Sequence, residues 1–216
     1  STLVPMIGTP AEDRARARFS GVCPPNCTIT PSGCTRSTML SSAAEMLRES
    51  GAAGVTIDAV LSRSGAPRGS VYHHFPGGRE ELLLASVERA GEIVSGVLEQ
   101  SLSAGDTASA IDRFVSMWKK WLRDSDFRAG CPVLATAIDT SEAPLQDAVR
   151  KIFQRWHDDL LRQLVAEGCP RAKARRLATM IVASIEGALV LARTQRDVRP
   201  LNDVTAELHL LLRSAA

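Results

Sequence analysis

Residues 64–82 read SGAPRGSVYHHFPGGREEL, and this stretch decides the fold class. Glycines bracket a short run that holds the only Tyr of the chain and two of its four His. Before this run, apolar residues repeat at helical spacing and stop at Gly51, after which Thr56 opens a short helix that ends at Gly65. Two short helices joined by a tight turn containing Gly are typical of a helix-turn-helix.

The next short helix is predicted over residues 67–73, because Pro67 suits the first turn of a helix. In a helix-turn-helix, the second helix enters the major groove of DNA and its early residues meet the base edges. Arg68 offers two donors to one guanine edge. Gly69 and Ser70 are small, so the backbone can come close to the duplex.

Tyr72 and His73 follow on the same predicted helix, where they can donate hydrogen bonds to phosphate oxygens. The net charge of the chain is only +2, so positive charge for DNA binding must be local. Residues 59–79 contain three Arg and no acid. A window of this length without acids also arises by chance, so its charge is weak evidence on its own.

Further helical patterns fill the remainder of the chain, and no alternating strand pattern of useful length occurs. The helix expected at about 171–195 is apolar nearly all round, which requires burial on two faces. We predict an all-α protein of about nine helices. Its parts are an irregular N-terminal extension (1–35), a helix-turn-helix domain (36–83) and a C-terminal helical domain (84–216).

Metal binding and catalysis find little support in the sequence. The adjacent His73 and His74 do not face one another on a helix and cannot chelate one ion. Cys131 and His157 have no accompanying orienting motif, so a buried small residue is the preferred interpretation of Cys131. We therefore expect no metal, no cofactor and no enzymatic activity.

The sequence shows no stretch that approaches the roughly 18 to 20 apolar residues of a membrane span. A basic region followed by an apolar run, as in a signal peptide, is not present at its start. The expected location is the cytoplasm, without membrane association.

The run from about Thr38 to Leu84 resembles the DNA-binding domain of the TetR family of bacterial repressors. Two stretches, SGAPRGSVYHHFPGG and the later GCPVLATAID at residues 130–139, are similar to the LmrA/YxaF-like branch. The family pattern falls here on Gly51, Thr56, Gly65, Tyr72-His73-His74-Phe75 and Arg79-Glu80-Glu81-Leu82.

The helix-turn-helix pattern and the resemblance together predict a role in DNA binding for nine residues. Thr56 caps the second helix near phosphate, Arg79 lies near phosphate at the start of the fourth helix, and Arg36 sits at the mouth of the first helix. His74 and Phe75 are expected to pack inward. The full predicted set is Arg36, Thr56, Pro67, Arg68, Gly69, Ser70, Tyr72, His73 and Arg79.

The resemblance also implies a homodimer held by a four-helix bundle, formed from the helices at 171–195 and 200–213 of each subunit. The alternative is that both faces of the first of these helices are buried inside one subunit. The candidate interface residues are Ala183, Gly187, Ala188, Leu191, Leu208 and Leu211.

The middle helices, residues 106–167, would enclose a cavity for a small-molecule effector. The candidate wall is mostly apolar, so a hydrophobic or aromatic effector is expected: Trp118, Trp121, Cys131, Leu134 and Trp156. The predicted function is a ligand-responsive repressor that binds a palindromic operator as a dimer. The alternative is a helical small-molecule-binding protein without operator-specific DNA binding.

Overall fold

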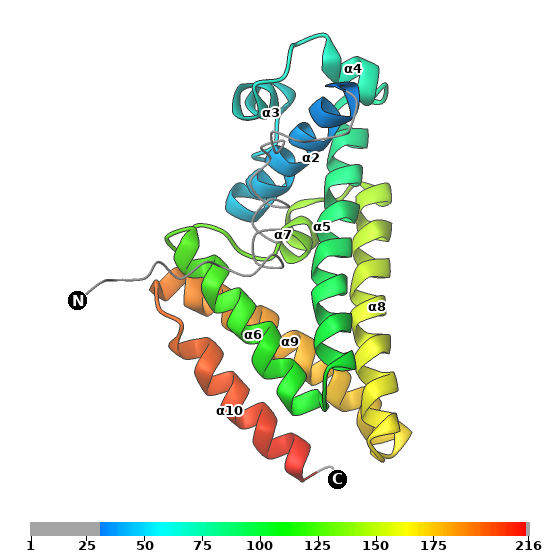
Figure 1. Ribbon diagram of the computed structural model, residues 1–216, viewed down its shortest axis with the longest axis vertical. Helices are drawn as coiled ribbons and strands as arrows, with labels where there is room; N and C mark the ends of the chain where they lie inside the picture. Colours follow the sequence, from blue (N-terminus) through cyan, green and yellow to red (C-terminus); the bar gives the residue numbers. More distant parts are fainter. Residues whose placement is uncertain (1–30, 215–216) are drawn as a thin grey trace, which may run out of the picture.

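The computed structural model describes residues 31–214, with side chains from residue 35 onward. This part of the chain consists of nine helices and contains no strand (Figure 1), which confirms the all-α prediction. The helices are α2 (Pro31–Ser50), α3 (Ile57–Ser64), α4 (Ser70–His74), α5 (Gly78–Ser103), α6 (Thr107–Asp124), α7 (Pro132–Asp139), α8 (Ala143–Ala166), α9 (Arg171–Gln195) and α10 (Arg199–Arg213).

Helices α2, α3 and α4 form the head at one end of the molecule, and α5 to α10 form the body (Figure 1). Helix α2 begins at Pro31, so the expected start at residue 36 is wrong by five residues. The earlier part of the predicted irregular extension lies outside the described residues. As expected, α2 gives way to Gly51, whose φ of +71° is a conformation that favours glycine.

The boundaries of α3 follow the sequence signals. The Thr56 side chain accepts a hydrogen bond from the Ala59 amide at 3.2 Å, which satisfies one of the unpaired amides at the start of the helix. Gly65 ends the helix with φ +66°. The predicted cap and the predicted end of this helix are both confirmed.

The next helix is shorter than predicted. Helix α4 begins at Ser70, so the expected start at Pro67 is wrong and Arg68 lies in the turn before the helix. The cause is local, because the Pro67 carbonyl accepts from both the amide and the hydroxyl of Ser70, at 2.9 and 2.6 Å. These bonds close a tight turn before the first helical residue.

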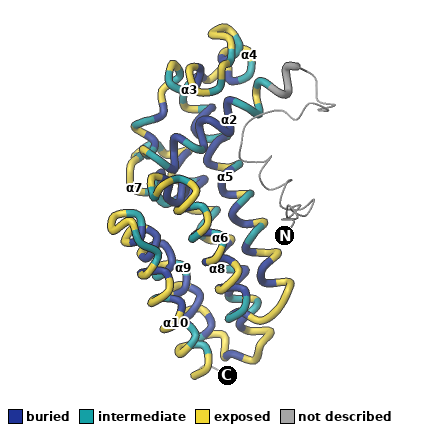
Figure 2. Tube along the Cα trace, turned by 60° about the vertical axis from the view of Figure 1, so that its left-hand side comes forward, coloured by how far each residue is buried: buried dark blue, intermediate teal, exposed yellow. Residues whose placement is uncertain are grey.

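The head is anchored to the body by the start of α5. Phe75, Leu82 and Leu83 are fully buried among the apolar residues of α2. The Glu81 carboxylate accepts from the Gly77 amide at 2.8 Å, close to the positive end of the helix dipole. Figure 2 shows the buried faces of α2 and α5 turned toward the centre of the molecule. The head therefore shares one continuous core with the body.

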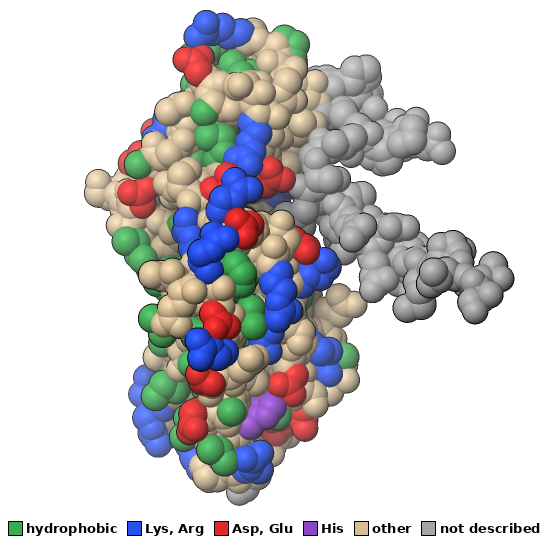
Figure 3. Space-filling model, turned by 90° about the vertical axis from the view of Figure 1, so that its left-hand side faces the viewer, with side chains coloured by type: hydrophobic (Ala, Val, Ile, Leu, Met, Phe, Trp, Pro, Cys, Tyr) green, Lys and Arg blue, Asp and Glu red, His purple; other side chains and the backbone are tan. Residues whose placement is uncertain are grey.

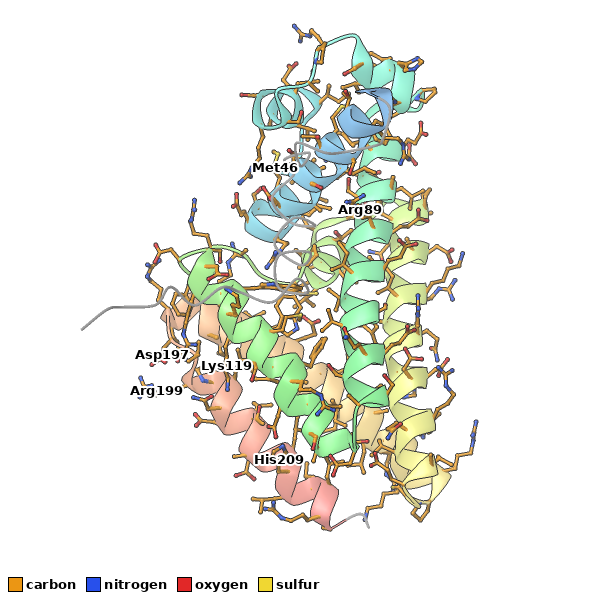
Figure 4. All side chains as sticks on the ribbon, viewed as in Figure 1. Met46, Arg89, Lys119, Asp197, Arg199 and His209 are labelled. Carbon is orange, nitrogen blue, oxygen red and sulfur yellow. The ribbon has the colours of Figure 1, made fainter. Side chains whose placement is uncertain are left out.

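In the body, α8 runs alongside α5, and α9 packs between α8 and α10. Helix α10 closes the side of α6, where His209 Nε2 lies 3.2 Å from Asp112 Oδ1 (Figure 4). Helices α6, α8, α9 and α10 each contribute large, fully buried side chains to the body: Trp118, Leu122, Leu145, Leu164, Ile181, Leu189 and Leu201.

Helix α9 departs from one expectation and from the alternative that both of its faces are buried inside one subunit. By length and composition it is apolar enough to cross a membrane, so the statement that no stretch approaches a span is wrong. Its position between α8 and α10 is that of a core helix. Only one face is buried within the chain, because Met180, Val190 and Leu191 are 48–50% exposed on the other.

The end of α2 is hydrogen-bonded to the body. The last carbonyls of a helix have no partner within it. Here the Gly130 amide donates to the Arg48 carbonyl at 2.9 Å, and Arg193 Nη2 donates to the Glu49 carbonyl at 2.6 Å. The Ala53 amide donates to Asp139 Oδ2 at 2.6 Å. Helices α7 and α9 thus hold the end of the helix that supports the head.

We expect Gly51→Ala to lower the free energy of unfolding by about 1–3 kcal/mol, because φ +71° is unfavourable for alanine and a Cβ there would lie 2.8 Å from Asp139 Oδ2. Urea unfolding measures the change. Gly96→Ala on α5 is the control, since nothing lies within 4 Å of its Cβ and the change should stabilise the helix by about 0.5–1 kcal/mol. Equal effects of the two substitutions would contradict the prediction.

Candidate nucleic-acid interface and effector cavity

Helix α4 presents a polar face on an apolar anchor. Val71 and Phe75 are fully buried, whereas Tyr72 is 62% exposed and His73 is also exposed. This division follows from the helical period, because neighbouring residues project about 100° apart. The two predicted phosphate-contacting side chains therefore lie on the surface, and the short helix that carries them is fixed in place.

The backbone before α4 is open. Gly69 lies in the turn, and a Cβ placed on it would meet nothing within 4 Å. The exposed Thr56, at the start of α3, is the other predicted backbone-contacting residue near this surface. We define as the recognition surface the predicted DNA contacts that are exposed between the start of α3 and the end of α4: Thr56, Pro67, Arg68, Gly69, Tyr72 and His73.

Arg68 is paired within the chain. Its Nη2 lies 2.7 Å from Asp58 Oδ1, and the two side chains are 82% and 75% exposed. An ion pair this exposed contributes at most about 1 kcal/mol, so it restrains Arg68 only weakly. Figure 3 shows basic and acidic side chains next to one another at this end of the molecule and interleaved over the face below it.

The other two Arg of the window at 59–79 also have partners. Arg63 forms a two-pronged ion pair with Glu49 of α2, at 2.9 and 3.0 Å. Arg79 donates from Nε to the Val55 carbonyl at 2.7 Å and from Nη2 to the Ala52 carbonyl at 2.6 Å. The stretch without acids in the sequence is therefore not free of acids in space, and Arg79 supports the loop between α2 and α3.

Arg36, the remaining predicted DNA contact, lies in the first turns of α2. It is exposed, and its guanidinium sits 5.0 Å from the centre of the Phe75 ring. This cation–π contact links α2 to the end of α4. The inward packing predicted for Phe75 is confirmed, and His74 is half-buried.

A groove and a smaller cavity are found in the described part of the body. A groove of about 720 Å³ runs between α7, α8 and α9, and its residues are Leu134, Ile138, Phe153, His157, Thr179, Val182, Ala183, Glu186, Gly187, Val190 and Leu191. A second, closed cavity of about 30 Å³ lies between α5, α6, α8 and α9. The groove has the size of a small-molecule site, and the closed cavity holds about one water.

The predicted effector wall is divided by the structure. Leu134 lines the groove and Trp156 lines the closed cavity, where its Nε1 donates to Ser95 Oγ at 2.8 Å. Trp118 and Trp121 line neither cavity; they stack edge to face at 5.0 Å, and Trp121 lies under Arg48. Cys131 is buried at the start of α7.

Glu186 is the one carboxyl shared by both cavities, and the sequence analysis overlooked it. It is only 9% exposed. Burial raises the pKa of Glu186 to about 7, opposed in part by the neighbouring Cys131 thiol, which donates a hydrogen bond to it. The sequence does contain a feature that could have identified this residue, because Glu186 is the single acid within the apolar run of α9.

The predicted dimer residues also divide into two groups. Ala183, Gly187 and Leu191 lie on the exposed side of α9, and Leu211 of α10 is 40% exposed. Ala188 and Leu208 are wrong as interface residues, because they point into the subunit and are 1% and 2% exposed. We call the exposed apolar side of α9 the outer stripe: Met180, Ala183, Gly187, Val190 and Leu191.

A helix-turn-helix head on a helical body with an internal cavity defines a class of protein, the one-component DNA-binding regulators. Residues 39–86 match the family described as bacterial regulatory proteins of the tetR family. Residues 107–207 match the C-terminal domain of LmrA/YxaF-like transcriptional regulators. The chain belongs to the TetR family of transcriptional regulators, with an LmrA/YxaF-like C-terminal domain.

Individual relatives agree with this assignment. The chain is 38% identical to the HTH-type transcriptional regulator Rv0196 of Mycobacterium tuberculosis, over 82% of this chain and 93% of that protein. It is 30% identical to YxaF of Bacillus subtilis, over 86% and 98%. A solved TetR regulator from Chloroflexus aurantiacus is similar in structure, with a TM-score of 0.68, 30% identity and coverage of 82% and 93%.

We expect Asp58→Asn to strengthen binding to duplex DNA by up to about fivefold, because it releases Arg68 and removes a negative charge from the recognition surface. Fluorescence anisotropy at low salt measures the change. Glu99→Gln removes a paired acid near the end of α5 that is remote from the head and should leave DNA binding as it was. Weaker binding of Asp58→Asn would instead give this acid a supporting role at the interface.

Proposed function

We propose that this regulator is an effector-controlled repressor that binds a two-fold symmetric operator as a homodimer in the cytoplasm. The observation that carries the proposal is the recognition surface, where Arg68, Tyr72 and His73 are exposed around the open backbone of Gly69. In the proposed complex, this surface enters the major groove. Arg68 meets a guanine edge, and Tyr72 and His73 meet phosphates.

The outer stripe supports a dimer. A row of apolar residues about three turns long on one helix is costly to leave in water, and a second copy of the same stripe would bury it. Two-fold symmetry then sets the two recognition surfaces about 34–36 Å apart, or a multiple of this spacing. Because Ala183, Gly187 and Leu191 belong to both the stripe and the groove, the partner subunit would roof the groove.

Helix α7 supports a route from effector to DNA. Leu134 and Ile138 of this helix line the groove, and Asp139 at its end accepts from the Ala53 amide next to α2. An effector that fits the groove only when α7 moves would therefore shift the end of α2. It would favour head positions that no longer match the operator spacing, and so release the DNA.

The function is tested by fluorescence anisotropy with duplexes tiled across the DNA upstream of the gene for this chain, at several salt concentrations. Site-specific binding predicts one palindromic tile with tight binding that weakens steeply with salt. The logarithmic slope is roughly 0.9 per neutralised phosphate. Equal, weak binding to every tile would favour the alternative, a small-molecule-binding protein without operator recognition.

We expect Gly69→Ala to weaken operator binding about tenfold or more, because the added methyl group points into the open space through which the backbone approaches the duplex. Stability should be kept or raised by about 0.4–1 kcal/mol, since the φ of −69° at this residue suits alanine. Anisotropy and urea unfolding together separate the two effects. Operator binding equal to that of the original protein would place the duplex away from this turn.

We expect Leu191→Glu to convert the proposed dimer into a monomer at micromolar concentration, because it introduces a charge into the stripe that the dimer would bury. Analytical ultracentrifugation measures the change, and operator affinity should fall with it. Val165→Glu, which alters another partly exposed apolar residue outside the stripe, is the control. A dimer that survives Leu191→Glu would place the interface elsewhere.

A further inference from the structure

Glu186 is an acid without a counter-charge in an apolar surrounding. It projects from the middle of α9 and lines both the groove and the closed cavity. From α5, α6 and α8, the side chains that face the closed cavity with it are apolar or aromatic: Leu98, Ala110, Ile111, Phe114, Trp156 and Leu160. Burial of an acid in such a place is costly unless it is paired.

One oxygen of Glu186 has no partner. Oε2 is buried and forms no hydrogen bond within the described part of the chain. The Cys131 thiol is a weak donor to the carboxylate and supplies no charge. Buried acceptors of this kind are almost always hydrogen-bonded in folded proteins, so an unpartnered one that faces a cavity is a binding feature in need of a ligand.

The other polar groups of the groove are already engaged. His157 Nε2 lies 3.2 Å from the Arg175 carbonyl, and the Thr179 hydroxyl donates to the same carbonyl at 3.1 Å. The remainder of the groove is apolar. A molecule that fills it would therefore meet hydrophobic walls on most sides and Glu186 of α9.

We propose that the groove binds a mainly apolar molecule with a single protonated amine, and that Glu186 is the residue that binds this amine. This inference rests on the proposed effector-controlled function and specifies the chemistry of its ligand. The ammonium would donate to the carboxylate once the side chain turns its covered Oε2 toward the groove, and would neutralise the negative charge. The apolar part would lie along α7 and α8 against Leu134 and Phe153.

An ammonium fits this site better than the other simple groups. A carboxylate or phosphate would place a second negative charge beside Glu186. A neutral hydroxyl can donate one hydrogen bond but leaves the acid without a counter-charge. A protonated amine provides both the donor and the charge, and charge-assisted hydrogen bonds are about twice as strong as neutral ones. The hydrophobic effector expected from the sequence thus acquires one defined polar group.

The protonation of Glu186 gives the proposal a signature. Its pKa of about 7 means that the buried carboxyl holds a proton through much of the range in which an ordinary glutamate is ionised. Binding an ammonium requires the ionised form, so affinity for an amine should fall as pH drops below 7, by up to about tenfold per pH unit. The titratable groups that face Glu186 are Cys131 of α7, whose pKa burial raises well above its usual value, and His157 of α8.

The same shift has a consequence for stability. The pKa of Glu186 is higher in the folded protein than in the unfolded chain, so the folded state binds the extra proton between the two values. The contribution of this group is therefore most favourable below the unfolded pKa and is lost as pH rises through about 7. Glu186→Gln has no such proton, and its stability relative to the original protein should increase from pH 5 to pH 7.

The experiment uses the full chain and three probes of one shape: 1-naphthylmethylamine, 1-naphthalenemethanol and 1-naphthoate. Dissociation constants are measured by calorimetry at pH 7.5 for the original protein, for Glu186→Gln and for the control Glu207→Gln, which removes an exposed acid from α10. Operator affinity without any probe is measured on the same preparations by anisotropy.

The expected result is that the amine binds the original protein at least about tenfold more tightly than the alcohol, and the carboxylate binds more weakly still. Glu186→Gln should lose this preference, and Glu207→Gln should keep it. Equal binding of amine and alcohol to the original protein would overturn the proposal. So would an amine preference that survives Glu186→Gln, or a difference in stability between this variant and the original protein that stays constant from pH 5 to pH 7.

The two levels of the proposal fail separately. If the operator is bound but the amine preference is missing, the proposed regulatory function is retained and the proposed ligand chemistry is wrong. If the amine preference depends on Glu186 but no duplex is bound, the ligand chemistry stands and the proposed control of DNA is wrong.

Discussion

The carbonyl groups at the end of α2 are the constraint on which the arrangement of the head depends. A helix leaves its last carbonyls without partners, and here the Arg48 and Glu49 carbonyls receive donors from residues more than eighty positions away in the sequence. The donors are the Gly130 amide and the Arg193 guanidinium. Arg79 adds two further donors to the loop that follows. The orientation of the recognition surface is therefore set by contacts that the body supplies.

The groove between α7, α8 and α9 lies close to these contacts, because α7 lines the groove and its last residue bonds to the chain after α2. Helix α7 is eight residues long, with groove-lining side chains on one side and Asp139 at its end. A helix this short moves as a unit, because it has only two turns and few internal hydrogen bonds to distort. In the proposed mechanism, this one short helix connects the groove directly to the end of α2.

Local signals in the sequence predicted much of the head. Gly51, Thr56 and Gly65 each act through the backbone of their own neighbourhood, so their effects on α2 and α3 could be inferred without knowledge of the fold. Pro67 was misleading, since it suits both the first turn of a helix and the turn that precedes one. The ion pair of Arg63 could not be predicted from the sequence, because its partner Glu49 lies on a different helix.

In the body, helical periodicity predicted the helices but not which side of each faces inward. Gly187 and Ala188 are adjacent small residues that the sequence does not distinguish, yet Gly187 is exposed and Ala188 is buried. The apolar pattern of α9 continues round the helix, so only packing against α8 and α10 distinguishes its sides. Glu186 was overlooked for the same reason, although a single acid within an apolar run indicates a carboxyl group that is partly or fully buried.

The dependence of the head on the body bears on the exchange of domains between regulators. A chimaera that joined residues 31–77 to the body of a relative would bring with it helix-end carbonyls and an amide whose partners stay behind. Unless the foreign body carried equivalents of Gly130, Asp139 and Arg193, these groups would lose the hydrogen bonds that fix the end of α2. The unit that fixes the position of the head is accordingly larger than the helix-turn-helix: three residues of the body belong to it.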